Sequence, residues 1–147
     1  MRAIVQRVSR AAVRVGEDTA GAIGRGFVVL IGVGRGDIDA DADFLADRIA
    51  GLRVFADEAG KMNLAIGAVR GAILVISQFT LHADTSQRRP SFIGAAPPDE
   101  ARRLYEYFIS RIRDRGVKVE TGEFGAHMDV ELVNDGPVTI ILDRKDR

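Results

Sequence analysis

Short apolar stretches of strand length recur along the chain, whereas only two stretches have the longer period of an amphipathic helix. The stretch 72–76 is apolar at every position, which predicts a central strand that is buried on both faces. We expect one mixed α/β domain over residues 1–147, with mixed or antiparallel sheets forming a barrel-like core and two main helices. The expected strands cover residues 3–15, 27–33, 52–55, 72–76, 117–124, 128–134 and 138–143.

Both helices have recognisable ends. The first is expected to start at Asp39 or Asp41, either of which could cap its first turn, and to end at Gly51. The second is expected to start near Pro98, because proline is favoured in a first helical turn, and to stop at Gly116. Its apolar positions have helical spacing and are Leu104, Tyr105, Phe108 and Ile112.

Composition excludes several classes of protein. The chain has 147 residues and no cysteine, so disulfide scaffolds, thiolate zinc sites and cysteine nucleophiles are excluded. Lys and Arg together number 21, as do Asp and Glu, so the net charge is close to zero. A protein that follows a long track of nucleic-acid phosphates usually has a basic surface, so a nucleic-acid partner would be held only at a short end.

The first residues, "MRAIVQRVSRAAVRV", alternate apolar and basic side chains and do not resemble a signal peptide. No stretch of the chain is apolar over the length that a membrane span needs. We therefore expect no membrane partner and a cytoplasmic location.

Two pairs of a histidine and an aspartate, His82 with Asp84 and His127 with Asp129, are candidates for a metal site. On a strand, residues two apart lie on the same face, so two such pairs could supply four ligands to a metal-dependent hydrolase. The same spacing is common at the ends of ordinary strands, and nothing in the sequence brings the two segments together.

Ser77 and Thr80 follow the buried strand 72–76 and are candidate nucleophiles. Such a nucleophile needs a base and an orienting acid. His82 is near in sequence, but Ser77 and His82 are five residues apart and would face opposite sides of a strand. No G-x-S-x-G elbow occurs, so a catalytic triad has little support.

The strand pattern of residues 131–143 is interrupted by Asn134-Asp135-Gly136-Pro137. Proline cannot donate a hydrogen bond to a sheet, so it belongs at an edge or at the start of a strand. The interruption is therefore either a plain turn or a piece of backbone placed for recognition.

Two motifs resolve this ambiguity when they are taken together. The stretches "SQFTL" (77–81) and "NDGPVT" (134–139) resemble the two signature segments of the D-aminoacyl-tRNA deacylase (D-tyrosyl-tRNA(Tyr) deacylase) family. The resemblance extends over nearly the full chain through "MRAIVQRVSRAAVRV", "LRVFADEAGKMN", "RPSF" and "GEFGAHMDVELVNDGPVTIILD", in the expected order.

The resemblance implies an enzyme that hydrolyses the ester between a D-amino acid and the terminal adenosine of tRNA, as chiral proofreading in translation. It also implies release of glycine from mischarged tRNA. The family is a homodimer with pockets at the subunit interface and uses no metal or other cofactor, so we expect none here. The partners are then the acceptor ends of D-aminoacyl-tRNA and glycyl-tRNA, together with a second copy of the chain.

The resemblance also assigns residues. The catalytic pocket would be lined by Ser77, Gln78, Phe79 and Thr80. Backbone N–H groups around Phe79 and Thr80 would hold the developing oxyanion. In the family the Gly136-Pro137 bond is cis, and its carbonyl groups reach into the partner subunit's pocket to hold the substrate's amino group. Residues that would anchor this dipeptide or form the wall beside it are Arg7, Phe124 and Met128.

The physics of the residues agrees with these roles. D- and L-amino acids carry the same groups, so selection between them requires a wall that excludes one side chain. A glycine residue such as Gly136 lets a backbone wall approach the substrate closely. The same wall cannot reject glycine as the amino acid of the substrate, because glycine has no side chain to exclude. No histidine is placed to activate Thr80, so we expect the neighbouring ribose hydroxyl to assist water while the protein supplies position and oxyanion donors.

Two other functions stay open from the sequence. One is the metal-dependent hydrolase with the two His–Asp pairs, and the other is a non-catalytic protein that binds the tRNA end. Arg88 and Arg89 could form a local basic patch, although "TSQRRPSF" departs from the commoner form of that family segment.

Overall fold

The computed structural model describes residues 1–144, which form one mixed α/β structure. The helices are α1 (Asp39–Gly51) and α2 (Pro98–Arg113), with short 3₁₀ helices η1 (Ile66–Val69) and η2 (Phe79–His82). The strands are β1 (Arg2–Val15), β2 (Asp18–Ile23), β3 (Gly26–Gly32), β4 (Phe55–Ala56), β5 (Met62–Leu64), β6 (Ala72–Ser77), β7 (Lys118–Thr121) and β8 (Asp129–Asp143).

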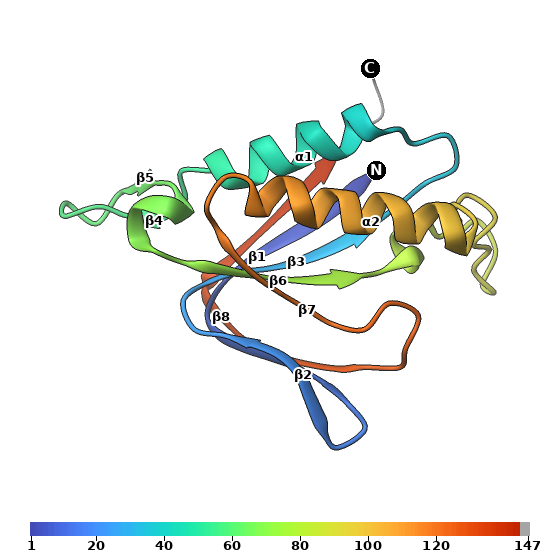
Figure 1. Ribbon diagram of the computed structural model, residues 1–147, viewed down its shortest axis with the longest axis horizontal. Coiled ribbons are helices and arrows are strands. Elements are labelled where there is room, and N and C mark those ends of the chain that lie inside the picture. The colour runs from blue at the N-terminus through green and yellow to red at the C-terminus, as the bar shows by residue number, and fades with distance from the viewer. Residues whose placement is uncertain (145–147) are drawn as a thin grey trace.

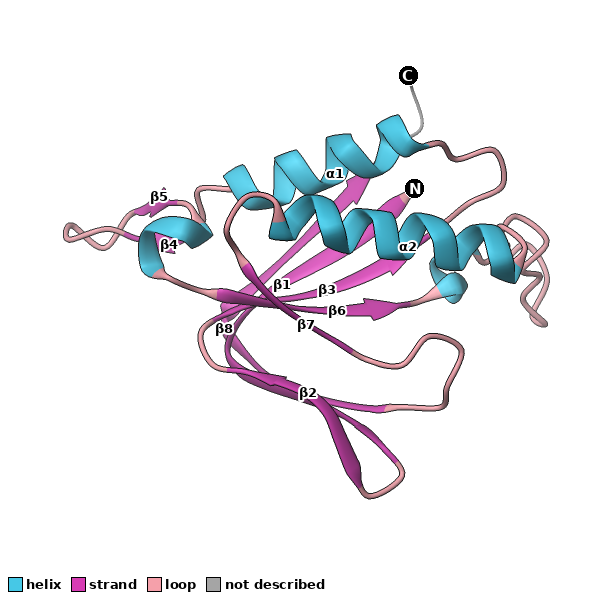
Figure 2. Ribbon diagram, in the orientation of Figure 1, coloured by secondary structure: helices cyan, strands magenta, loops and turns pink. Residues whose placement is uncertain are grey.

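The main sheet is organised around β1, which is long enough to pair with three strands. Along the sheet the order is β2-β1-β3-β6-β7, and β8 pairs with β1. β1 is antiparallel to all three of its partners, whereas β3, β6 and β7 run parallel to one another. The sheet curls strongly so that β2 and the first part of β8 pass beneath the other strands (Figure 2). This nearly closed, mixed sheet with two helices confirms the expected fold class.

Alternating residues of the parallel strands supply two apolar layers. Phe27, Val29 and Ile31 of β3 belong to the layer beneath α1 and α2. Val28 of β3 and Leu74 of β6 point to the opposite face and pack inside the curl of the sheet. Both helices cover one face of the sheet (Figure 1), and the curl of the sheet encloses the other face. Burial on both faces explains why residues 72–76 are apolar at every position.

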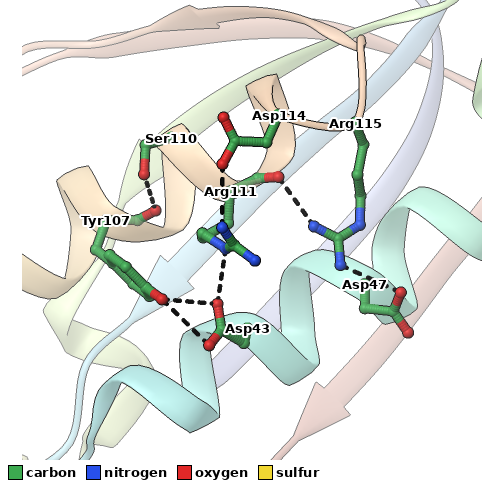
Figure 3. A network of polar contacts seen from close by, with 7 residues as sticks. All are labelled: Asp43, Asp47, Tyr107, Ser110, Arg111, Asp114 and Arg115. Carbon is green, nitrogen blue, oxygen red and sulfur yellow. Dashed lines mark hydrogen bonds and ion pairs between the residues drawn. The ribbon is translucent and has the colours of Figure 1, made fainter.

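The two helices are also joined by a polar network on their exposed side (Figure 3). Asp43 of α1 accepts hydrogen bonds from the Tyr107 hydroxyl at 2.9 Å and from Arg111 Nε at 2.9 Å. The hydrogen bond to Asp43 raises the pKa of Tyr107, because it stabilises the neutral phenol. Such exposed ion pairs contribute little individually, so the apolar layer below is the main source of stability.

Several expected boundaries were wrong. α1 is not capped by Asp39 or Asp41: its N-cap is Ile38, and the buried Asp41 reaches back from the third helical position to accept the Ile38 N–H at 2.9 Å. The strand expected at 52–55 begins only at Phe55 and pairs with β5. β2 was not expected at all, because its Gly21 resembled part of a turn.

The largest correction concerns the C-terminal segment. The two strands expected at 128–134 and 138–143 are one continuous strand, β8, which passes through the Gly136-Pro137 step. Within residues 1–144, no helix has both the length and the apolar character that a membrane crossing requires.

Candidate active site

A cavity lies beyond the carboxyl ends of the three parallel strands. Val33 follows β3, Ser77 ends β6, and the segment 124–128 follows β7. The cavity has a volume of about 710 Å³, and most of its remaining wall comes from residues between Phe92 and Ala101, with Arg35 and Val130. Most of the lining side chains are apolar, as in typical small-molecule sites. Crevices at the carboxyl ends of parallel strands are common ligand sites, because loops and free backbone groups meet there.

The chain turns sharply where β6 enters this cavity. Ser77 is the last residue of β6, and the Gln78 N–H still donates to Ile31 O of β3 at 2.8 Å. The 3₁₀ helix η2 then begins at Phe79, and the Gln78 side-chain amide donates to the Thr80 hydroxyl. Within residues 1–144, the N–H groups of Phe79 and Thr80 donate no hydrogen bond to another residue. They stand at the start of η2, where a 3₁₀ helix offers its N–H groups no internal acceptor.

Gly32 lets η2 pack directly against the end of β3. A Cβ at Gly32 would lie 2.9 Å from the Gln78 carbonyl oxygen and 3.0 Å from Leu81 Cβ. The His82 Nε2 atom forms a hydrogen bond with the Gly32 carbonyl oxygen at 3.0 Å. β3 thus holds η2 near both ends, through Gln78 before it and His82 at its last position, and these contacts fix the position of its first N–H groups.

The predicted catalytic residues fall into two groups. Ser77, Gln78 and Phe79 line the cavity, whereas Thr80 is beside it and does not line it. The Phe79 ring is 55% exposed and meets Phe92, 36% exposed, edge to face at 5.2 Å. These two rings therefore present aromatic surface at the mouth of the cavity.

Phe124 and Met128, the residues predicted for the pocket wall, also line the cavity. Phe124 packs against Tyr105 at 5.5 Å, and the Arg102 guanidinium lies 5.2 Å from its ring centre. Burial raises the pKa of Tyr105 to about 12, so its hydroxyl stays protonated. It donates a hydrogen bond to the Val75 carbonyl oxygen at 3.4 Å, which ties α2 to β6 behind this wall.

The other predicted site residues, Arg7, Gly136 and Pro137, lie together at an irregularity of β8. In the pairing of β8 with β1, Thr139 lies opposite Gln6 and Asn134 lies opposite Val8. The four residues 135–138 therefore face Arg7 alone and form an outward bulge. The Gly136-Pro137 peptide bond in this bulge is cis, and Gly136 has a φ of +141°.

Two side chains hold the bulge. Arg7 Nε donates to the Asp135 carbonyl oxygen at 3.0 Å, and Arg7 Nη1 donates to the Val54 carbonyl oxygen at 2.6 Å. The Asn134 amide oxygen accepts the Val138 N–H at 2.7 Å, and its NH₂ group donates back to the Val138 carbonyl oxygen at 3.3 Å. Arg7 thus anchors the bulge from outside and Asn134 closes it from within.

The structure does not bring the bulge to the cavity of the same chain. Gly136, Pro137 and Arg7 are absent from the cavity lining, and both residues of the dipeptide are exposed. The nine predicted site residues therefore form two separate places on one chain.

The His–Asp pairs do not form a site. His82 belongs to η2 rather than to a strand, so the assumption that placed His82 and Asp84 on one strand face is wrong. Asp84 accepts the Ser86 N–H at 2.9 Å, and this hydrogen bond lowers the pKa of its carboxyl group. Across residues 1–144, no three histidine, aspartate or glutamate side chains gather in a way that could hold a metal ion.

Comparison with known proteins identifies the family of this chain. The sequence model of D-Tyr-tRNA(Tyr) deacylase matches residues 4–143. The chain belongs to the D-Tyr-tRNA(Tyr) deacylase family. A family member from Thermotoga petrophila, named D-aminoacyl-tRNA deacylase, is 58% identical over 144 residues and 97% of each chain. One from Geobacter sulfurreducens with the same name is 57% identical over 148 residues, covering 100% of this chain and 97% of its own.

Solved structures share the fold of this chain. The structure titled c-Myc DNA Unwinding Element Binding Protein has a TM-score of 0.94 and 40% identity, covering 99% of this chain and 100% of its own. A probable eukaryotic D-amino acid tRNA deacylase has a TM-score of 0.84 and 17% identity, covering 97% and 98% of the two chains, which supports the fold alone.

Several residues of these two places were missed by the sequence interpretation. Gly32 carries no signal beyond its place at the end of an apolar run. Arg35 and Phe92 line the cavity from loops that are distant in sequence. Asn134 lies inside a recognised motif, but the role of its side chain depends on the bulge geometry.

Proposed function

We propose that this chain hydrolyses the ester of D-aminoacyl-tRNA to release the free D-amino acid and tRNA, as its named relatives do. The observation that carries this proposal is the turn after Ser77. There Ser77, Gln78 and Phe79 line a mostly apolar cavity, and the N–H groups of Phe79 and of the adjacent Thr80 donate no hydrogen bond within residues 1–144. Preorganised donors of this kind stabilise an oxyanion, and each is typically worth about 2.7–4 kcal/mol.

The protein then acts mainly by position and electrostatics. The Thr80 hydroxyl accepts the Gln78 amide and has no histidine partner among residues 1–144. The ribose hydroxyl beside the ester is the nearer group to assist the attack of water. Holding the ester in such a geometry can supply several kcal/mol of the barrier without a side-chain nucleophile.

Selection between enantiomers is assigned to the Gly136-Pro137 bulge of a second copy of the chain. The bulge is exposed and does not line its own cavity, so only another subunit could present it to one. We therefore propose a homodimer in which the carbonyl groups of the bulge hold the substrate's amino group and exclude an L side chain. Glycine has no side chain to exclude, so glycyl-tRNA is a substrate as well.

Matched D- and L-tyrosyl-tRNA test this function, with ester loss followed with and without a metal chelator. The expected result is rapid release of D-tyrosine, slow or no release of L-tyrosine, and no effect of the chelator. Loss of activity with chelator and its return with zinc would instead support a metal-dependent hydrolase. Tight binding of D-tyrosyl-tRNA without ester loss would instead support a non-catalytic protein that binds the tRNA end.

A further inference from the structure

The cavity contains one permanent charge among its lining residues. Arg35 is the only lysine, arginine, aspartate or glutamate on the wall, as far as residues 1–144 describe it. It follows β3 by three positions and is exposed at the rim rather than enclosed. An unpaired cation on a mostly apolar wall that has no acidic residue predicts an anionic group in the ligand that occupies the cavity.

The guanidinium of Arg35 is fixed at one end only. Its Nε donates to the Ile93 carbonyl oxygen at 2.5 Å, and its backbone N–H donates to the Gly94 carbonyl oxygen at 3.0 Å. Its two terminal amino groups contact no acceptor within residues 1–144. An arginine that is oriented by its Nε and open at both terminal nitrogens presents the forked donor pair that binds a phosphate group.

Arg35 lies near the mouth of the cavity, where it would contact the part of a substrate that extends out of the cavity. Ile93, which holds the guanidinium, follows Phe92, and Phe92 packs on Phe79 at the mouth. Exposed aromatic rings beside an arginine are a common arrangement for single-stranded nucleic acid, with bases on the rings and phosphate on the arginine.

We propose that Arg35 binds the phosphate on the 5′ side of the terminal adenosine of the aminoacylated strand. This proposal rests on the proposed function, which puts the ester at the turn after Ser77. The ribose then lies between the ester and the cavity mouth, with its 5′ oxygen directed outward. The contact recognises a nucleotide end rather than an amino acid ester in general, which matches a chain of zero net charge that grips one short end.

The test compares two small substrates that differ only in this phosphate: 3′-O-D-tyrosyl-adenosine and its 5′-monophosphate. The wild-type protein should have a kcat/KM about tenfold higher for the phosphorylated ester. Arg35→Gln should bring this preference close to unity, because kcat/KM should fall much more for the phosphorylated ester than for the unphosphorylated one. Arg35→Lys keeps the charge but not the Nε donor, so it should retain at least about half of the preference.

The control is Arg48→Gln, because Arg48 is an exposed arginine that lies over Phe44 on α1 and does not line the cavity. It should leave the preference intact.

With D-tyrosyl-tRNA, Arg35→Gln should lower the slope of log kcat/KM against log salt concentration by about 0.7, the value for one contact to a single strand.

Equal losses on both small esters, or equal losses for Arg35→Lys and Arg35→Gln, would overturn the inference and leave Arg35 as a support for Ile93. These failures differ from failure of the proposed function. In that case the wild-type protein would not release tyrosine from D-tyrosyl-tRNA at all.

Discussion

The turn after β6 and the bulge in β8 are both departures from regular strand geometry. They differ in how they are held and in what they face. The turn is built from backbone, packed against Gly32 and directed into a cavity. The bulge is held by the side chains of Arg7 and Asn134, and it projects outward with no cavity of its own. Under the proposed function, the turn is the reaction site and the bulge completes the reaction site of a second copy of the chain.

This difference implies that rate and selectivity reside in different parts of one chain. A change at the turn should slow hydrolysis of every substrate. A change at the bulge should alter the ratio of D to L rates more than the D rate itself. Substitutions at each place can therefore break or sharpen the distinction.

Gly32→Ala should have the largest effect. The new Cβ would lie 2.9 Å from the Gln78 carbonyl oxygen, so η2 and its N–H groups must move away from the ester. A displacement of this order typically costs about a hundredfold in rate, so D-tyrosyl-tRNA hydrolysis should fall by at least that factor. Gly24→Ala is the matched control, because a Cβ at Gly24 meets no atom within 4 Å. Activity within about threefold of wild type would show that η2 is not the reaction site.

Gly136→Ala should change selectivity more than rate. Its φ of +141° disfavours an L side chain, and the new Cβ would lie 2.8 Å from Val138 Cγ2 and 3.0 Å from the Val138 backbone nitrogen. The bulge must then shift, and we expect the ratio of D- to L-tyrosyl-tRNA hydrolysis to fall at least about tenfold. An unchanged ratio in a folded variant, measured with both charged tRNAs, would remove the bulge from chiral selection.

Asn134→Ala should have a smaller effect of the same kind. It removes the acceptor of the Val138 N–H and both donor contacts that close the bulge. Loss of such partners costs about 1–3 kcal/mol, which loosens the bulge without blocking it, so the D to L ratio should fall only a few-fold. Gln6→Ala removes a comparable amide that contacts Thr139 from β1, and it should leave the ratio unaltered. If both variants behave alike, Asn134 has no special role.

Thr80→Ala should have the smallest effect. The Thr80 hydroxyl accepts the Gln78 side chain and does not line the cavity. We expect D-tyrosyl-tRNA hydrolysis to stay within about tenfold of wild type, because the contribution of the residue is its backbone N–H. A loss of several orders of magnitude in single-turnover assays would restore Thr80 as a nucleophile.

The sequence predicted best where periodicity determines structure. The apolar stretch 72–76 and the start of the helix at Pro98 were located nearly to the residue, because burial on one or two faces leaves a regular pattern; the helix ends at Arg113, three residues before the expected stop at Gly116. β2 and the start of β4 were not, because they depend on pairing with distant strands that leaves little local pattern.

Motif resemblance predicted the site residues but not their arrangement. It named Ser77 to Thr80 and Gly136-Pro137 and implied that they meet only across a subunit interface, but the local geometry that separates them on one chain could not be derived from the sequence. The residue pattern predicted two strands in place of β8, because proline usually ends a strand. A bulge accommodates that proline only because four residues of β8 face one residue of β1.

A mixed dimer tests most directly whether one subunit completes the site of another. Differently tagged Gly32→Ala and Gly136→Ala chains can be co-expressed, and the species carrying both tags purified. One of its two sites would combine an intact turn with an intact bulge from the other chain. The account predicts about half of the wild-type D-tyrosyl-tRNA activity with the wild-type D to L ratio. Recovery of rate with the low ratio of Gly136→Ala, or failure to obtain a mixed dimer, would contradict it.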